Sequence, residues 1–243
     1  MYVFLNNTGM TYVLLVLLGL VVGSFVSAIT YRIPRGLGFI KGRSFCDNCK
    51  KELRLFDNIP LFSFLFYRGS ARCCKKRISI RYPLIELATL LGVVVVWSLS
   101  SSLVFVVLYL LTLTILIIDL EHQYIPDELS FAILLLFLLT SYHPLFSSLF
   151  AGFLCAFLLL LIHLSTRGRG MGLGDVKLAI ALGAWLGLEK GLTWLMTSFI
   201  LGGIVAFFLL ILRKAKLKTK IAFGPFLIIA FWIIFFNIVR LSL

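Results

Sequence analysis

Long apolar runs separated by short polar segments dominate the chain, from its first residues almost to its end. A helix that crosses a bilayer needs about 20 predominantly apolar residues, and most of these runs approach that length. The predicted spans cover residues of about 10–29, 83–99, 103–118, 129–141, 145–164, 171–188, 192–212 and 221–238. The pattern therefore predicts an all-α polytopic membrane protein with about eight transmembrane helices.

One polar insert interrupts this pattern, at residues 32–82, and it contains four of the five cysteines. We therefore divide the chain into a first transmembrane helix (1–31), a cytoplasmic basic loop domain that carries the cysteines (32–82), and a membrane core of about seven helices (83–243). The residues before the first span lack the basic region of a signal peptide, and the apolar run that follows is too long for one. We interpret this run as an anchor helix.

Basic residues account for most of the charge and are confined to a few segments. The chain has 23 Lys and Arg against 10 Asp and Glu, a net charge of +13, although 61% of its residues are hydrophobic. Thirteen of the basic residues lie within 32–81, three within 167–177 and five within 213–220. Dense basic segments in alternate loops follow the positive-inside rule, so we place them on the cytoplasmic side. The membrane explains this charge, and we expect lipid but no nucleic acid as a partner.

Two aspartates lie near the cytoplasmic ends of predicted spans. Asp119 follows an apolar stretch and begins the motif DLEHQYIPD, and Asp175 lies about one turn into the helix that starts with MGLGD. Ionisable residues within transmembrane segments are functional candidates, and a rise of about 1.5 Å per residue places both at a similar depth. We therefore predict that Asp119 and Asp175 come together as a pair.

A close pair of carboxyl groups suits the hydrolysis of a peptide bond. In a site of low dielectric the two groups share one proton, because ionising both is costly. The ionised member can take a proton from an attacking water, while the protonated member donates to the carbonyl oxygen and then to the leaving amine. This chemistry needs no cofactor. Gly172 and Gly174 lack side chains and would let an extended substrate or a neighbouring helix approach Asp175.

Each aspartate also has a simpler interpretation. Asp119 alone fits a carboxylate at the membrane interface, and Asp175 fits an acid at a helix N-terminus. Asp127 is a rival partner in the same loop, although Pro126 before it favours the start of the next helix and a structural role. The alternative function is a polytopic proton- or ion-coupled transporter that uses the membrane aspartates. Its path would need polar residues at the midplane, and the predicted helices have almost none.

Several motifs follow one another in an order that resembles one family. They are VGSFVSAITYRIPRG after the first span, CDNC at 46–49, DNIP at 57–60, YRG at 67–69, ISIRYPLIE at 78–86, IDLEHQYIPD and GMGLGDVKLA. The set covers nearly the whole chain and resembles the bacterial type IV prepilin peptidase family, the GxGD-type intramembrane aspartyl peptidases that include prepilin leader peptidase/N-methyltransferases. The resemblance implies that Asp119 and Asp175 are the catalytic residues. Lys177 also matches a family motif, as an active-site support or an anchor at the membrane interface.

The resemblance further implies a substrate, a location and a second activity. Family members cut prepilin or pseudopilin precursors of pili, type II secretion or competence just after a glycine, at the cytoplasmic face of the bacterial inner membrane. Many members then methylate the new N-terminus with S-adenosylmethionine. This chain has no glycine-rich strand-to-helix motif of the Rossmann kind. A methyl-donor site must therefore be built in another way, and the sequence assigns no residues to it.

The cysteines of the polar insert are candidate metal ligands. Cys46 and Cys49 form a CxxC pair, and Cys73 and Cys74 follow in the same insert. Four thiolates in such an arrangement are typical of a tetrahedral zinc site. The resembling enzymes carry two CxxC pairs, whereas Ala71 stands here in place of one cysteine. Cys73 is then out of register, and we expect strain if adjacent cysteines bind one ion. Two hypotheses stay open: a zinc site with water or Cys73 as fourth ligand, and a reduced loop held by packing.

Overall fold

The computed structural model describes residues 8–38, 45–46, 48–49, 51–52, 64, 66–140, 145–213 and 221–241. These residues are mostly helical, and they contain two isolated β-bridges but no strand. The predicted all-α architecture is therefore confirmed. The DNIP motif at 57–60, the turn at 141–144 between two predicted spans, and most of the basic segment 213–220 lie outside the described residues.

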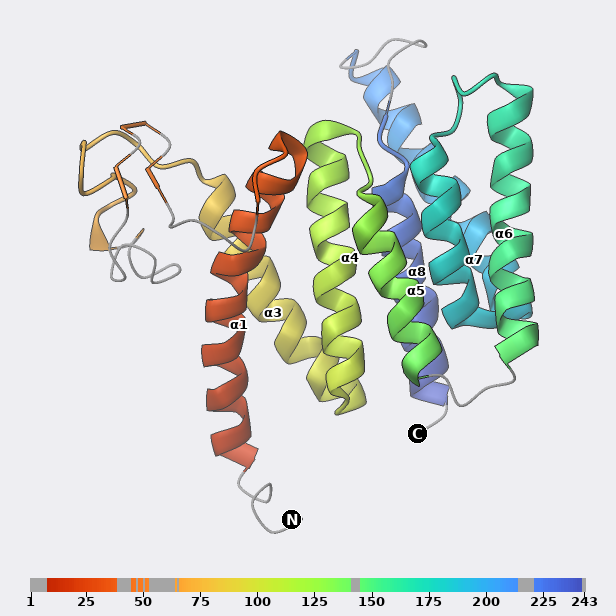
Figure 1. Cartoon of the computed structure of the whole chain (residues 1–243), viewed down its shortest axis with the longest axis horizontal. Coiled ribbons are helices and arrows are strands. Elements are labelled where there is room, and N and C mark those ends of the chain that lie inside the picture. Colours follow the sequence, from red (N-terminus) through yellow and green to blue (C-terminus); the bar gives the residue numbers. More distant parts are fainter. Residues whose placement is uncertain are drawn as a thin grey trace. The chain divides into compact units, whose positions relative to one another are not determined.

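The chain divides into two compact units, residues 1–110 and 111–243. In chain order the helices are α1 (Thr8–Arg32), the 3-10 helix η1 (Ile33–Arg35), α3 (Arg81–Ser100), α4 (Leu103–His122), α5 (Asp127–Thr140), α6 (Leu145–Ser165), α7 (Leu173–Ile211) and α8 (Gly224–Leu241) (Figure 1). Helix α4 begins in the first unit and ends in the second. The three domains that the sequence predicts, with boundaries after residues 31 and 82, were defined by the polar insert, and this division stays a prediction.

In the first unit, α1 packs along α3. The contact is close because Gly23 has no side chain: a Cβ built there would lie 3.1 Å from the Cα of Glu86. Small residues allow such an approach between membrane helices. The hydroxyl of Tyr109 donates a hydrogen bond of 2.9 Å to the carbonyl of Ala88, so the start of α4 is tied to α3.

Helix α7 consists of two arms that meet at Gly187. This residue has φ 72° and ψ 179°, a left-handed conformation that glycine adopts without strain. The chain turns back at the break (Figure 1). The sequence predicts two helices here, 171–188 and 192–212, and the structure confirms both, with the break slightly earlier than the predicted turn.

Helices α6 and α7 pack closely through small residues. A Cβ built at Gly152 would collide with the carbonyl oxygen of Ile180, and one built at Gly183 would lie 3.0 Å from the Cα of Gly152. Such contacts hold membrane helices together through van der Waals packing, since lipid supplies no hydrophobic force between them. The first arm of α7, which carries Asp175, is therefore fixed against α6.

Two tryptophans fix α8 within the second unit. The indole N–H of Trp232 donates to the hydroxyl of Thr112 on α4 at 3.0 Å. The indole N–H of Trp194, on the second arm of α7, donates to the carbonyl of Leu227 at 2.7 Å. These buried bonds connect the first turn of α8 to α7 and the middle of α8 to α4, the helix that carries Asp119.

Five of the described helices are long and apolar enough to cross a membrane, namely Gly9–Arg35, Arg81–Ser100, Leu103–His122, Leu145–Ser165 and Leu173–Ile211, and Gly224–Ile238 is a shorter apolar helix. Many large apolar side chains on these helices are exposed, as expected of surfaces that face lipid. The chain is thus a multi-pass membrane protein. The number of about eight spans stays a prediction, because α7 contains two arms and α5 has only 14 residues.

Candidate active site and cysteine cluster

Asp119 lies inside α4, because the helix continues to His122. The predicted helix ends at residue 118, so the structure corrects this boundary by about one turn. The Asp119 side chain is only 4% exposed. Its Oδ2 atom lies against the first residue of α8, since a Cβ built at Gly224 would be 2.6 Å from this oxygen.

Asp175 lies in the first turn of α7, which begins at Leu173. The predicted start at Met171 is thus two residues early. Gly172 precedes the helix in an extended conformation, and its backbone N–H donates a 3.1 Å hydrogen bond to Asp175 Oδ2. The side chain is 7% exposed. This bond holds one carboxylate oxygen toward the backbone at the helix N-terminus, which favours a negative group.

The structure brings the two aspartates together, close enough for a direct electrostatic interaction. Asp119 Oδ2 and Asp175 Oδ1 are both buried, and neither accepts a hydrogen bond from the part of the chain that the structure describes. A buried carboxylate oxygen without a partner costs free energy, so such atoms mark places where a water or ligand binds. Each carboxyl group therefore offers one oxygen at which a water or a ligand can bind.

The two glycines of the GxGD motif allow close packing around Asp175. A Cβ built at Gly174 would lie 2.9 Å from the Cβ of Ile125, which is in the loop between α4 and α5. A Cβ built at Gly172 would lie 3.0 Å from Asp175 Oδ2. The sequence predicts that these glycines let either a substrate or a neighbouring helix approach Asp175. At Gly174 the structure shows the approach of another segment of this chain, the loop that contains Ile125.

Asp127 and Lys177 form an ion pair at the edge of the site. Lys177 Nζ lies 2.6 Å from Asp127 Oδ2 and joins the first turn of α5 to the second turn of α7. Their side chains are 62% and 53% exposed, in contrast with the buried Asp119 and Asp175. An exposed ion pair contributes little to stability, about 1 kcal/mol at most. The structure confirms that the helix after Pro126 begins at Asp127.

His163, at the end of α6, fixes the loop that leads to Asp175. Its Nδ1–H donates a 2.7 Å hydrogen bond to the carbonyl of Met171, the residue before Gly172. The Thr166 hydroxyl accepts from the backbone N–H of Gly170 in the same loop. Sequence reasoning did not assign a role to this histidine, because no local pattern relates it to a backbone carbonyl eight residues later.

We expect His163→Ala to lower the rate of substrate cleavage about tenfold, because losing one hydrogen bond frees the segment that holds Asp175 Oδ2. His163→Asn should keep most of the rate, since its amide N–H can replace Nδ1–H. The rate is measured on purified protein with a precursor substrate. Equal rates for His163→Ala and the unmodified chain would show that the loop keeps its conformation without this bond.

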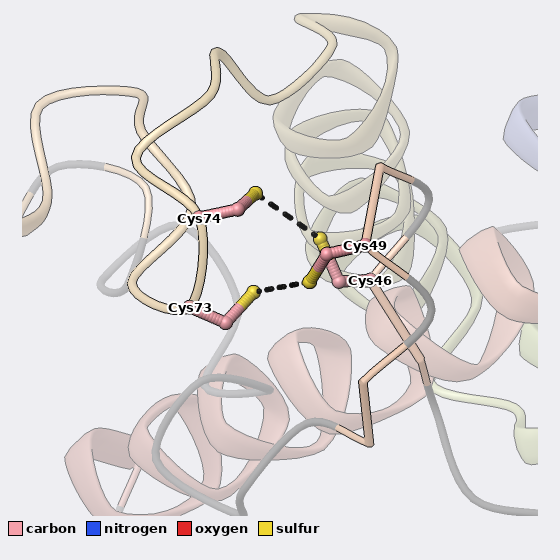
Figure 2. Close-up of side chains that lie close together, drawn as sticks. All are labelled: Cys46, Cys49, Cys73 and Cys74. Carbon is pink, nitrogen blue, oxygen red and sulfur yellow. Dashed lines mark hydrogen bonds between the residues drawn. The ribbon is translucent and has the colours of Figure 1, made fainter.

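The four cysteines of the polar insert lie together, and Figure 2 shows their sulfur atoms facing one another. All four Sγ atoms lie within 4.8 Å of one another, with 3.9 Å between Cys46 and Cys74 and 3.2 Å between Cys49 and Cys73. In a tetrahedral site with zinc–sulfur distances of about 2.3 Å, sulfurs are about 3.8 Å apart. The donor set and spacing therefore fit zinc.

Two similar hairpins present these cysteines. The bridge between Phe45 and Glu52 closes one, and the bridge between Ser70 and Arg77 closes the other. Each hairpin has the same backbone hydrogen bond next to its bridge. In the first, the N–H of Cys46 donates to the carbonyl of Lys51 at 2.9 Å, and in the second, the N–H of Ala71 donates to the carbonyl of Lys76 at 2.8 Å.

Ala71 thus occupies the position that Cys46 has in the first hairpin, as the sequence predicts. Of the two fourth ligands that the sequence leaves open, water and Cys73, the structure favours Cys73, because its sulfur lies in the cluster. It reaches the cluster because residues 71–74 form a turn, in which Lys75 donates its N–H to the carbonyl of Ala71. Adjacent cysteines in a turn can present both sulfurs to one side.

The thiol of Cys46 loses its proton more easily than an ordinary cysteine, which favours metal binding. Burial raises the pKa of its thiol, but hydrogen bonds from the backbone N–H groups of Cys49 and Asn48 and from the thiols of Cys73 and Cys49 together lower this pKa to about 7. Zinc binds the thiolate, so a lowered pKa reduces the cost of losing the proton.

We expect the unmodified chain to bind about one zinc ion, and Cys73→Ser to bind substantially less, because serine removes one of four sulfur ligands. Cys155→Ala should keep its zinc, since this buried cysteine lies on α6 outside the cluster. Metal analysis of purified protein measures the content. Unchanged zinc in Cys73→Ser would exclude this residue as a ligand, and a metal-free unmodified protein would exclude the site.

Comparison with known proteins gives a consistent result over most of the chain. Residues 17–99 match the Bacterial Peptidase A24 N-terminal domain, and residues 105–207 match the Type IV leader peptidase family. Proteins named prepilin leader peptidase/N-methyltransferase are similar: 36% identical in Pseudomonas aeruginosa, 35% in Pseudomonas putida and 34% in Neisseria gonorrhoeae. These alignments cover 89% to 90% of this chain and 87% of each relative. No solved structure is significantly similar.

The first family match contains the cysteine hairpins, and the second contains Asp119 and Asp175. The matches therefore coincide with the two sites that the fold assembles. The chain belongs to the type IV leader peptidase family.

Proposed function

We propose that the chain is an intramembrane aspartyl endopeptidase that cleaves the leader peptide of type IV prepilins or pseudopilins after a glycine. Asp119 and Asp175 are the catalytic pair in this proposal. The observation that carries it is the pair of buried, interacting carboxyl groups, each with an oxygen that lacks a partner among the described residues. Family membership and the names of the relatives support the substrate class.

Hydrolysis follows from the shared proton of such a pair. The ionised aspartate accepts a proton from the water as its oxygen attacks the scissile carbonyl carbon, and the protonated aspartate donates to the carbonyl oxygen. Collapse of the tetrahedral intermediate then transfers a proton to the leaving amine. The fixed backbone around Gly172 and Gly224 keeps the carboxyl groups oriented, so little reorganisation is needed during reaction.

The proposed location is the bacterial inner membrane, with the active site toward the cytoplasm. The distribution of basic residues supports this orientation, because the clusters at 32–81, 167–177 and 213–220 fall in alternate connections. Gly172 and Asp175 lie within the second of these clusters, so the pair belongs near the cytoplasmic surface in this topology.

We also propose that the new N-terminus is methylated with S-adenosylmethionine as the methyl donor. The relatives named as N-methyltransferases support this second activity. The zinc ion of the cysteine cluster would act structurally, joining the two hairpins through Cys46, Cys49, Cys73 and Cys74, and peptide hydrolysis would proceed without it.

Co-expression with a candidate precursor tests both activities. Mass measurement of the mature product should show a cut after the glycine of the leader and one added methyl group at the new N-terminus. An uncut precursor, in cells where the chain is present in the membrane, would contradict the peptidase. A cut product without the methyl group would remove only the second activity.

A further inference from the structure

A cavity of about 370 Å³ lies in the first unit, where α1 and α3 meet the two cysteine hairpins. Its lining includes Ser27 and Ala28 of α1, Tyr82 and Glu86 of α3, and Phe45 and Arg77 of the hairpins. Pockets for small molecules usually measure about 300 to 1,000 Å³. The cavity is therefore large enough for a ligand, and none of the peptidase chemistry uses it.

The helix crossing creates this space. Gly23 brings α1 against the backbone of α3 at Glu86, and the small side chains of Ser27 and Ala28, about one turn later, leave the cavity open. Glu86 is only 9% exposed. A carboxylate is rarely buried in a helix of this kind without a role, because removing it from water is costly.

The lining combines opposite charges with aromatic rings. Glu86 of α3 supplies a carboxylate, and Arg32 of α1 and Arg72 and Arg77 of the polar insert supply cationic groups. The aromatic rings come from both helices and from the polar insert, and they are those of Tyr31, Phe45, Phe64, Tyr67 and Tyr82. A ligand that fits this lining has a flat aromatic part, a carboxylate, hydroxyl groups and a positive centre.

S-adenosylmethionine has all four features. Its adenine can stack on aromatic rings, its carboxylate can pair with an arginine, and its ribose hydroxyls can donate to a buried carboxylate. Its sulfonium is a cation that the face of an aromatic ring attracts. We propose that this cavity binds S-adenosylmethionine and is the methyl-donor site, an inference that rests on the proposed second activity.

The chemistry of transfer is balanced without another reactant. The lone pair of the deprotonated N-terminal amine forms a bond to the methyl carbon, and the electron pair of the broken carbon–sulfur bond returns to sulfur. The sulfonium becomes a neutral thioether, and the methylated amine is left with the positive charge. Methyl transfer therefore uses a different unit from cleavage, which depends on residues within 111–243.

Direct binding of S-adenosylmethionine to the purified full chain tests this site. Glu86→Gln and Ala28→Phe should each weaken binding about tenfold or more, the first by removing a charged hydrogen-bond acceptor and the second by filling the cavity. Leu87→Phe enlarges an exposed neighbour on α3, and Glu189→Gln neutralises an exposed acid on α7, so both should bind like the unmodified chain. Equilibrium dialysis with a methyl-labelled ligand measures the affinity.

Cleavage of a precursor by the same preparations reports whether each variant is folded. Variants that cleave should release product without the methyl group, and ultraviolet cross-linking should label peptides that contain Tyr31, Tyr67 or Tyr82. Unchanged affinity in both cavity variants, or labelling within 111–243, would overturn the inference. A chain that cleaves but binds no S-adenosylmethionine would also overturn it while leaving the peptidase intact. Binding without any cleavage would instead contradict the peptidase and leave this site supported.

Discussion

Asp119→Asn and Asp175→Asn should each abolish cleavage of a prepilin precursor while the protein still accumulates in the membrane. Asparagine has nearly the shape of aspartate but can neither accept a proton from water nor hold the shared proton. General acid–base catalysis contributes about 10²- to 10⁴-fold to a rate, and a loss of at least this size is expected. The fraction of mature product after co-expression and the rate with purified protein both measure it.

The fold should survive these substitutions, because both carboxyl groups are buried in a pair whose charge is costly. Thermal unfolding in detergent should therefore show an unchanged or slightly raised midpoint. Asp127→Asn is the informative comparison, because Asp127 is the rival partner. It should lower the rate only a few fold, since it removes an exposed ion pair with Lys177. Normal cleavage by Asp119→Asn, together with loss of cleavage in Asp127→Asn, would reassign the pair.

The helices could be predicted because their signal is local. An apolar run of membrane length specifies a helix wherever it occurs, and even the break in α7 is marked by a glycine between two such runs. The residues at which the helices begin and end could not be predicted as well from the sequence. Apolar length alone ends the third predicted span at residue 118, whereas backbone hydrogen bonds carry α4 on to His122. Asp119 therefore lies within the helix and is buried.

The aspartate pair was also accessible from sequence, because depth follows from charge distribution and the rise per residue. The residues around the pair could not be predicted from the sequence. Gly224 lies against Asp119, and Ile125 lies against Gly174 and Gly224, through packing between elements that no short motif relates. The cysteine cluster shows the same limit. Counting residues put Cys73 out of register and left open whether Cys73 or a water is the fourth ligand, whereas the turn at 71–74 brings its sulfur beside that of Cys49. The spacing of cysteines along the chain does not determine the direction in which each side chain points from a turn.

Gly224→Ala should lower the cleavage rate about 10²-fold with little effect on stability. The new Cβ would lie 2.6 Å from Asp119 Oδ2, closer than a real contact allows. The atom it meets is the end of a side chain, so the carboxylate can rotate away and the backbone need not move. A displaced catalytic group is costly, because a misplacement of about 1 Å can reduce a rate about 10²-fold.

Gly203→Ala is the matched control, because a Cβ built at Gly203 on the second arm of α7 meets nothing within 4 Å. Alanine also favours helix over glycine, so this variant should unfold at the same temperature as the unmodified chain or higher. For Gly224→Ala, the loss should appear in kcat with KM almost unchanged, since Asp119 acts on the water and the scissile bond rather than on substrate binding. If Gly224→Ala instead cleaves at the rate of Gly203→Ala, then Asp119 does not act from the position it has here, and the proton must be held between the two aspartates in another arrangement of α4 and α8.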